Sequence, residues 1–150
     1  MNFVKQQDER GCCVACVAML AGVAYETVWD DLRHTLSAEQ ILTAHVEFWL
    51  QYLEDRYGFD GTRDYWELES LDNLREIPKG TRYFCAYGLD DSHPKSDPLN
   101  THAFVLDKDG TVFDPAQDEP GALPIEKYRI PPRKLLIVVS AESHSAKALP

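Results

Sequence analysis

Three cysteines crowd the start of an uncharged, apolar segment near the beginning of the chain. Cys12, Cys13 and Cys16 fall within five positions, and no side chain from Cys12 to Ala24 carries a charge. A helix that is apolar on every side packs in the interior of a protein. A cysteine in its first turn has a lowered pKa, because the helix dipole and the unpaired N–H groups favour the thiolate. The segment therefore predicts a buried helix with a reactive thiol at its start, ended by Gly22.

A thiolate nucleophile needs a base, and the best candidate is His102, which opens a predicted strand. Asp114 ends the next predicted strand. The turn over residues 107–110 joins the two strands, because Gly110 tolerates the positive φ that such a turn requires. A hairpin brings the start of its first strand and the end of its second to one edge. The sequence thus predicts that the carboxylate orients the imidazole beside the thiol.

Helical patterns follow the cysteines. Apolar residues at helical spacing over residues 28–36 predict a second, amphipathic helix. Ser37 and Gln40 form a predicted capping box at the start of a third. The apolar stripe from Ile41 to Leu53 predicts that this third helix continues until Gly58.

Strand patterns dominate the second half of the chain. A predicted loop over residues 58–66 and a short predicted helix over 68–77 precede them. Four strands are predicted at residues 81–88, 102–106, 111–114 and 134–139, with long loops at 90–101 and 115–132 and a frayed end over the last ten residues. Helices first and strands second predict a single α+β domain over residues 1–150, with the helices packed on one face of an antiparallel sheet.

Composition narrows the classes of function. The net charge of −10 and the pI near 4.8 argue against a nucleic-acid or anionic-membrane partner. The longest uncharged run, residues 11–25, is too short to span a bilayer, so we expect no membrane segment. Three of the four cysteines fall within five positions, whereas a disulfide framework would spread them out, and no signal-peptide pattern opens the chain, so we expect reduced thiols in the cytoplasm.

The candidate residues occur in an order and spacing that resemble a known family. Gln6, then Cys12 six residues later with Val-Ala-Cys-Val-Ala-Met after Cys13, then His102-Ala-Phe-Val-Leu, and finally Phe-Asp114-Pro, resemble the papain-like cysteine peptidases. The pattern is closest to their compact bacterial branch, typified by the bacteriocin leader-processing (double-glycine) peptidases. The resemblance implies a papain-like fold, with the cysteine on a buried central helix and the histidine and aspartate on a C-terminal sheet.

The resemblance also implies roles for the residues. Cys12 would be the nucleophile, His102 the base, Asp114 the group that orients it, and Gln6 a donor to the oxyanion hole beside a backbone N–H of the cysteine. The chemistry agrees, because an oxyanion needs a neutral donor, which glutamine supplies. We therefore expect a thiol hydrolase that cleaves an amide, peptide or isopeptide bond in a peptide or protein substrate through an acyl-enzyme, without a cofactor or metal.

Several alternatives fit the same residues. Gln7 and Cys13 have the same six-residue spacing, but Cys12 places the residues that follow in the family's register. A transglutaminase-type acyl transferase would use the same triad. An inactive papain-like adaptor is a further alternative, as is a zinc-binding interaction module built on the Cys13-x-x-Cys16 pair.

Overall fold

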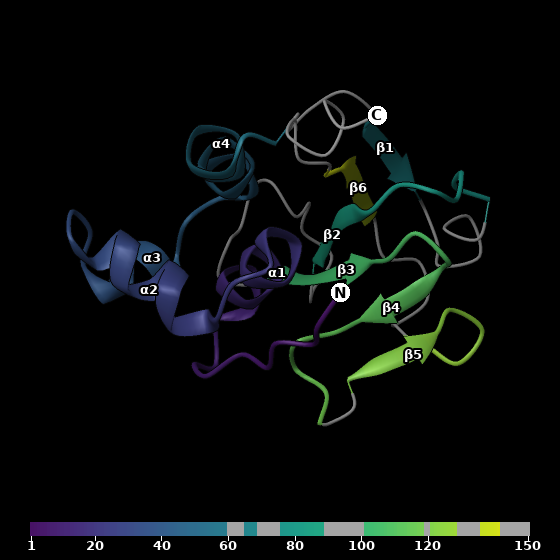
Figure 1. Ribbon diagram of the computed structural model, residues 1–150, viewed down its shortest axis with the longest axis horizontal. Coiled ribbons are helices and arrows are strands. Elements are labelled where there is room, and N and C mark those ends of the chain that lie inside the picture. Colours follow the sequence, from purple (N-terminus) through teal and green to yellow (C-terminus); the bar gives the residue numbers. More distant parts are fainter. Residues whose placement is uncertain (60–64, 69–75, 89–100, 119–120, 129–135, 142–150) are drawn as a thin grey trace.

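The structure, a computed structural model, combines a group of helices with one antiparallel sheet (Figure 1). It describes residues 1–59, 65–68, 76–88, 101–118, 121–128 and 136–141. The helices are α1 (Cys12–Ala21), α2 (Tyr25–Arg33), α3 (Ala38–Leu42) and α4 (Val46–Tyr57); the strands are β1 (Tyr65–Leu68), β2 (Tyr83–Gly88), β3 (Thr101–Leu106), β4 (Thr111–Phe113), β5 (Ala122–Pro124) and β6 (Leu136–Ser140). The predicted α+β class is confirmed.

The strands lie in the order β1-β6-β2-β3-β4-β5, and every neighbouring pair is antiparallel. The predicted hairpin is confirmed as β3 and β4. Gly110 adopts a φ of 88°, and the N–H of Asp107 donates to the carbonyl of Thr111 at 2.8 Å. This turn fixes where the start of β3 and the end of β4 meet.

Helix α1 is the centre of the helical layer. It packs against β3 on one side and against α2 and α4 on the other. Its side chains have no polar face to turn toward solvent, and Val17 and Ala18 are completely buried. Gly22 ends the helix in the left-handed conformation, with a φ of 72°, as predicted. The cysteine-bearing helix is therefore held rigidly in the core.

The two faces of the sheet bury different side chains. Along β3, Ala103 and Val105 join the core that contains α1, whereas Phe104 and Leu106 join a second core on the opposite face. This division follows from the alternation of side chains along a strand. His102 lies two positions before Phe104, on the same face of the sheet, near the start of β3.

The third predicted helix is in fact two helices. Ser37 and Gln40 form the predicted capping box, but α3 ends after one turn and a half, with Thr43 at its C-terminus. His45 then has an extended backbone, with φ −72° and ψ 159°, and α4 begins at the next residue. The apolar stripe crosses the break without interruption because Ile41 and the buried face of α4 belong to one core. Periodicity alone therefore could not locate the break.

Two strands lie where none was predicted. Residues 65–68 form β1, which contradicts both the loop predicted over 58–66 and the start of the helix predicted over 68–77. Residues 122–124 form β5 inside the predicted loop over 115–132. Both are edge strands of the sheet: β1 pairs with β6, which is distant in sequence, and β5 pairs with β4. Each is only three or four residues long, so the local sequence carries too little pattern to predict it. Residues 69–75 of the predicted helix lie outside the described residues, and residues 76 and 77 are not helical. Of the final ten residues, only residue 141 is described.

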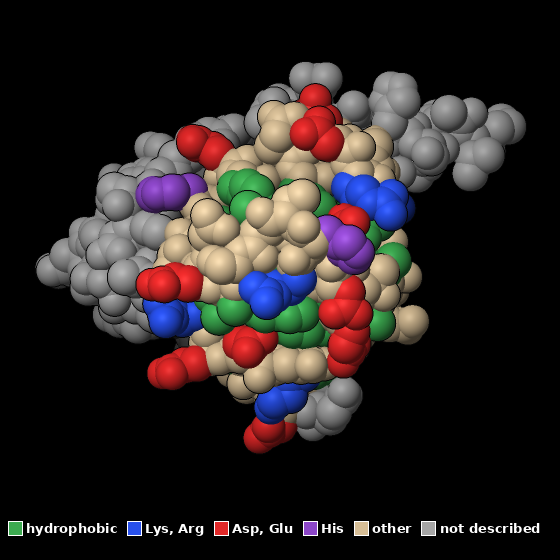
Figure 2. Space-filling view, turned by 90° about the vertical axis from the view of Figure 1, so that its left-hand side faces the viewer, with side chains coloured by type: hydrophobic (Ala, Val, Ile, Leu, Met, Phe, Trp, Pro, Cys, Tyr) green, Lys and Arg blue, Asp and Glu red, His purple; other side chains and the backbone are tan. Residues whose placement is uncertain are grey.

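Among the described residues, no single helix is long and apolar enough to cross a membrane. Helices α1 and α2 reach the required length and hydropathy only as a pair, and a bend of 112° separates them. The molecular face toward α2 and α3 carries scattered acidic side chains, with lysine and arginine between them (Figure 2).

Candidate active site

Cys12 is the first residue of α1, where the helix has no cap. Gly11 precedes it, no side chain accepts from the first N–H groups, and no acidic residue lies in the first turn. A Cβ at Gly11 would overlap the hydroxyl of Tyr25, which donates to Asp8 at 2.7 Å. The absence of a side chain at Gly11 therefore lets the backbone before α1 pack directly against Tyr25. The positive end of the helix dipole, which no side chain caps, favours a thiolate on Cys12.

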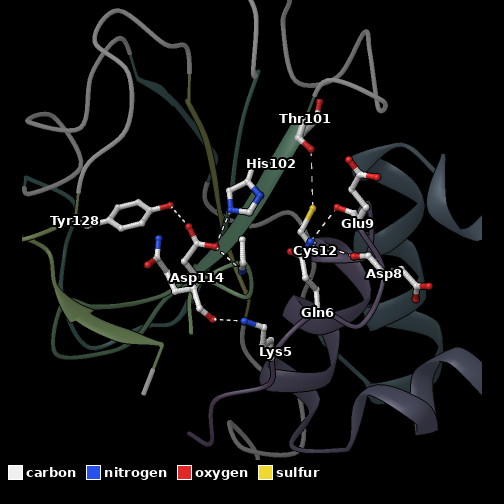
Figure 3. Close-up of polar contacts among 11 residues, drawn as sticks. Lys5, Gln6, Asp8, Glu9, Cys12, Thr101, His102, Asp114 and Tyr128 are labelled. Carbon is white, nitrogen blue, oxygen red and sulfur yellow. Dashed lines mark hydrogen bonds and ion pairs between the residues drawn. The ribbon is translucent and has the colours of Figure 1, made fainter. Parts of the chain in front are cut away.

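His102 and Asp114 lie side by side, as the hairpin register predicted (Figure 3). Nε2 of His102 is 2.7 Å from Oδ1 of Asp114, and the two side chains are only 13% and 6% exposed. Because Asp114 occupies Nε2, Nδ1 is the ring nitrogen that remains for the thiol. In Figure 3 the imidazole stands between the carboxylate and the Cys12 sulfur. That sulfur lies 3.9 Å from the carbonyl oxygen of Thr101, at the start of the same strand.

Two further donors fix the Asp114 carboxylate. The N–H of Ala116 donates to Oδ1 at 2.9 Å, and the hydroxyl of Tyr128 donates to Oδ2 at 2.6 Å. Both oxygens are therefore occupied, and the carboxylate cannot turn away from His102. Burial and the nearby Asp114 charge raise the pKa of Tyr128 well above its usual value, so the phenol stays protonated and remains a donor.

An aromatic cluster supports this arrangement from the second core. Tyr87 lies directly opposite His102 in the sheet, and their ring centroids are 5.6 Å apart in an edge contact. Phe104 packs against Tyr87 and, at 5.0 Å between centroids, against Tyr128. Tyr87 therefore packs in the second core and also contacts the imidazole. Sequence reasoning missed Tyr128 because it lies in a segment taken for a loop, with no pattern to mark it.

The electrostatics of the site favour an ion pair. Burial opposes a charged imidazolium, but the hydrogen bond to Asp114 and the interactions with Cys12 raise the pKa of His102 to about 10. Burial likewise opposes the carboxylate of Asp114, yet the hydrogen bond and charge of His102 lower its pKa below the usual range. At neutral pH these directions give a carboxylate and an imidazolium.

The two leading cysteines have opposite environments. A hydrogen bond from the Cys13 thiol and the bond and charge of His102 lower the pKa of Cys12 well below its usual value, against the effect of burial. The pKa of Cys13 is raised, first by its bond to Cys12 and then by burial, and His102 does not contribute. Burial raises the pKa values of Cys16 and Cys85. The thiol with the lowered pKa is therefore that of Cys12.

The Gln6 amide is engaged by the backbone of the segment that leads into α1. Nε2 donates to the backbone carbonyls of Asp8 at 3.1 Å and Glu9 at 2.9 Å, while Oε1 is buried without a hydrogen-bond partner. Flipping the amide would set Oε1 against those two carbonyls, so the orientation is well determined. The Gln6 N–H groups thus point at the backbone, and donation to an oxyanion requires the exchange of one of these bonds.

The segment around Gln6 is attached to the loop that carries the aspartate. The backbone N–H of Gln6 donates to the carbonyl of Pro115 at 3.0 Å, and Lys5 pairs with Asp118 at 2.5 Å. Gln7, the alternative partner in sequence spacing, instead donates to Glu26 on α2. The structure therefore brings Gln6, and not Gln7, to the candidate site.

Within the part of the chain that the structure describes, no three His, Cys, Asp or Glu side chains are grouped as metal ligands would be. Comparisons with protein-family models, curated proteins and solved structures find no match to this chain. The chemistry of the site thus rests on its own geometry. A low-pKa thiol, a raised-pKa imidazole and a fixed carboxylate are together suited to nucleophilic attack on an electrophilic carbon, followed by proton transfer to a leaving group.

Proposed function

We propose that this protein is a thiol hydrolase that cleaves an amide, peptide or isopeptide bond in a peptide or protein through an acyl-enzyme. The observation that carries the proposal is the position of His102 between Cys12 and Asp114, with the pKa of the thiol lowered and that of the imidazole raised. A structural histidine needs neither a thiolate partner nor three donors around its carboxylate. We extend the proposal to a papain-like fold, which the cysteine at the start of a central helix and the His–Asp hairpin support.

In the proposed reaction, the Cys12 thiolate attacks the carbonyl carbon and the carbonyl π electrons move to oxygen. The backbone N–H of Cys12 stabilises that oxyanion, joined by Gln6 when one of its amide N–H groups leaves its backbone partner. The tetrahedral intermediate collapses, the C–N bond breaks, and the imidazolium of His102 gives its proton to the leaving amine. Neutral His102 then takes a proton from water, which attacks the thioester and releases the acid and the thiolate.

Asp114 has a positioning role in this scheme. It keeps Nδ1 of His102 facing the sulfur and stabilises the imidazolium while the thiolate is waiting for substrate. The carboxylate itself need not change protonation, because its lowered pKa keeps it ionised throughout the cycle.

The test combines a Cys12→Ala variant with a panel of fluorogenic peptide aminomethylcoumarin amides. The proposal predicts hydrolysis by the wild-type protein, none by Cys12→Ala, and near-normal hydrolysis by the matched variant Cys85→Ala, whose sulfur lies in the other core. Circular dichroism would establish that all three are folded. Persistence of hydrolysis in Cys12→Ala would contradict the proposal. Added monodansylcadaverine separates the transglutaminase-type alternative, since transfer yields an amine adduct where hydrolysis yields a free acid.

A further inference from the structure

We propose that Arg10, which lines the small cavity beside Cys12, binds a carboxylate on the substrate segment that adjoins the scissile amide. This inference rests on the proposed hydrolase and adds the chemical class of its substrate. It assigns a binding role to a residue that the triad does not use.

The cavity is continuous with the candidate nucleophile. Cys12, Cys13 and Thr101 form its site-facing wall, and Arg10 belongs to the same lining. Its remaining walls come from the region of the break between α3 and α4 and are apolar: Ile41, Leu42, Ala44, Val46 and Trp49. A substrate whose carbonyl carbon reached the Cys12 sulfur would therefore have its neighbouring atoms at the opening of this cavity, beside Arg10.

The cavity is too narrow to enclose a long side chain. The space open to the centre of a water-sized molecule is about 20 Å³, which is room for about one water molecule. A charged group on the substrate would also pay a desolvation penalty among apolar walls. Recognition of charge is thus confined to the mouth, where Arg10 is exposed to solvent.

The charge of Arg10 is available to a ligand. Among the residues that the structure describes, its guanidinium has no hydrogen-bonding or ion-pair partner, in contrast to Lys5 and Arg82. The chain as a whole carries a net charge of −10 and therefore repels anions in general. Arg10 is a local positive charge at the opening of the cavity, where it can attract an anionic group. Guanidinium presents a fork of N–H donors that matches a carboxylate. An acidic side chain or a terminal carboxylate close to the scissile bond meets this requirement.

Two pairs of alkylating reagents test the inference and separate the two sources of carboxylate. N-iodoacetyl-glutamic acid α-amide and its glutamine analogue differ only in a side-chain carboxylate; N-iodoacetyl-glycine and N-iodoacetyl-glycinamide differ only in a terminal one. In each reaction the Cys12 sulfur forms a bond to the methylene carbon, the C–I bond breaks and iodide leaves. Peptide mapping by mass spectrometry gives the second-order rate at Cys12 for each reagent.

We expect the wild-type protein to prefer the acid over its amide by about two- to fivefold in at least one pair, as befits an exposed ion pair. The preference should disappear in Arg10→Gln, persist in Arg10→Lys and in the matched surface variant Arg33→Gln, and weaken as salt is raised. The pair that responds identifies the carboxylate as side-chain or terminal.

The outcomes keep the two proposals apart. Fast alkylation of Cys12 with an acid-to-amide ratio that is the same in wild type and Arg10→Gln, for both pairs, overturns the role of Arg10 and leaves the hydrolase standing. Alkylation of Cys12 no faster than that of an ordinary thiol overturns the proposed hydrolase and, with it, this inference.

Discussion

Replacing Asp114 with asparagine is expected to lower the pKa of His102 while preserving the shape of the site. A rise from the usual value of 6.5 to about 10 corresponds to a preference of ~5 kcal/mol for the imidazolium over the neutral ring. Asp114 and Cys12 both contribute to this preference, and burial opposes them. Removal of the carboxylate charge is therefore expected to remove about half of the preference for the imidazolium. This change lowers the pKa of His102 by roughly two pH units, to about 8.

Nuclear magnetic resonance of ¹⁵N-histidine-labelled protein measures this pKa directly, and His102→Gln assigns the resonance. The alkaline limb of the pH dependence of peptide-amide hydrolysis should move in parallel, because the imidazolium is the proton donor to the leaving amine. Asp118→Asn is the matched control, since that exposed carboxylate pairs with Lys5 away from the imidazole. An unchanged His102 titration in Asp114→Asn, or a wild-type titration near the usual value, would refute the reasoning.

Three further changes have defined consequences. Tyr128→Phe keeps the ring packing but removes a donor to the carboxylate, so hydrolysis should fall about tenfold with the fold intact by circular dichroism. In urea unfolding between about pH 7 and 8, wild-type stability should stay level, since the proton that folded His102 retains balances the one that folded Cys12 has lost. In Cys12→Ser, stability should decline with pH over the same range. Gly121→Ala should reduce stability by ~1–3 kcal/mol in thermal unfolding, because its φ is 66° and a Cβ would overlap Phe3.

The parts of the fold that local chemistry determines could be predicted from the sequence. Cys12 to Gly22 combines an uncharged run with a glycine at its end, and both features act within the segment itself. The hairpin turn at Gly110 is equally local. By contrast, β1 and β5 exist because of pairing with β6 and β4, and the break before α4 interrupts a stripe that stays apolar throughout. Such features depend on tertiary contacts that no local pattern contains.

The candidate site divides in the same way. The hairpin register predicted that His102 and Asp114 would meet, because strand pairing has a fixed geometry. The hydroxyl of Tyr128 on Asp114 could not be predicted, since it comes from a segment without regular structure, 14 positions along the chain. The orientation of the Gln6 amide was equally inaccessible, because two backbone carbonyls nearby decide it. The catalytic role assigned to each of these residues stays a prediction.

The central claim is that Cys12 carries the activated thiolate, and one labelling measurement tests it most directly. The intact protein is treated at pH 7 with a limiting amount of iodoacetamide, and mass spectrometry identifies the cysteine that is modified first. We expect Cys12 to be modified first, more than about tenfold faster than Cys13, and to react markedly more slowly in His102→Ala. First modification of Cys13, or slow and equal modification of all four cysteines, would contradict it.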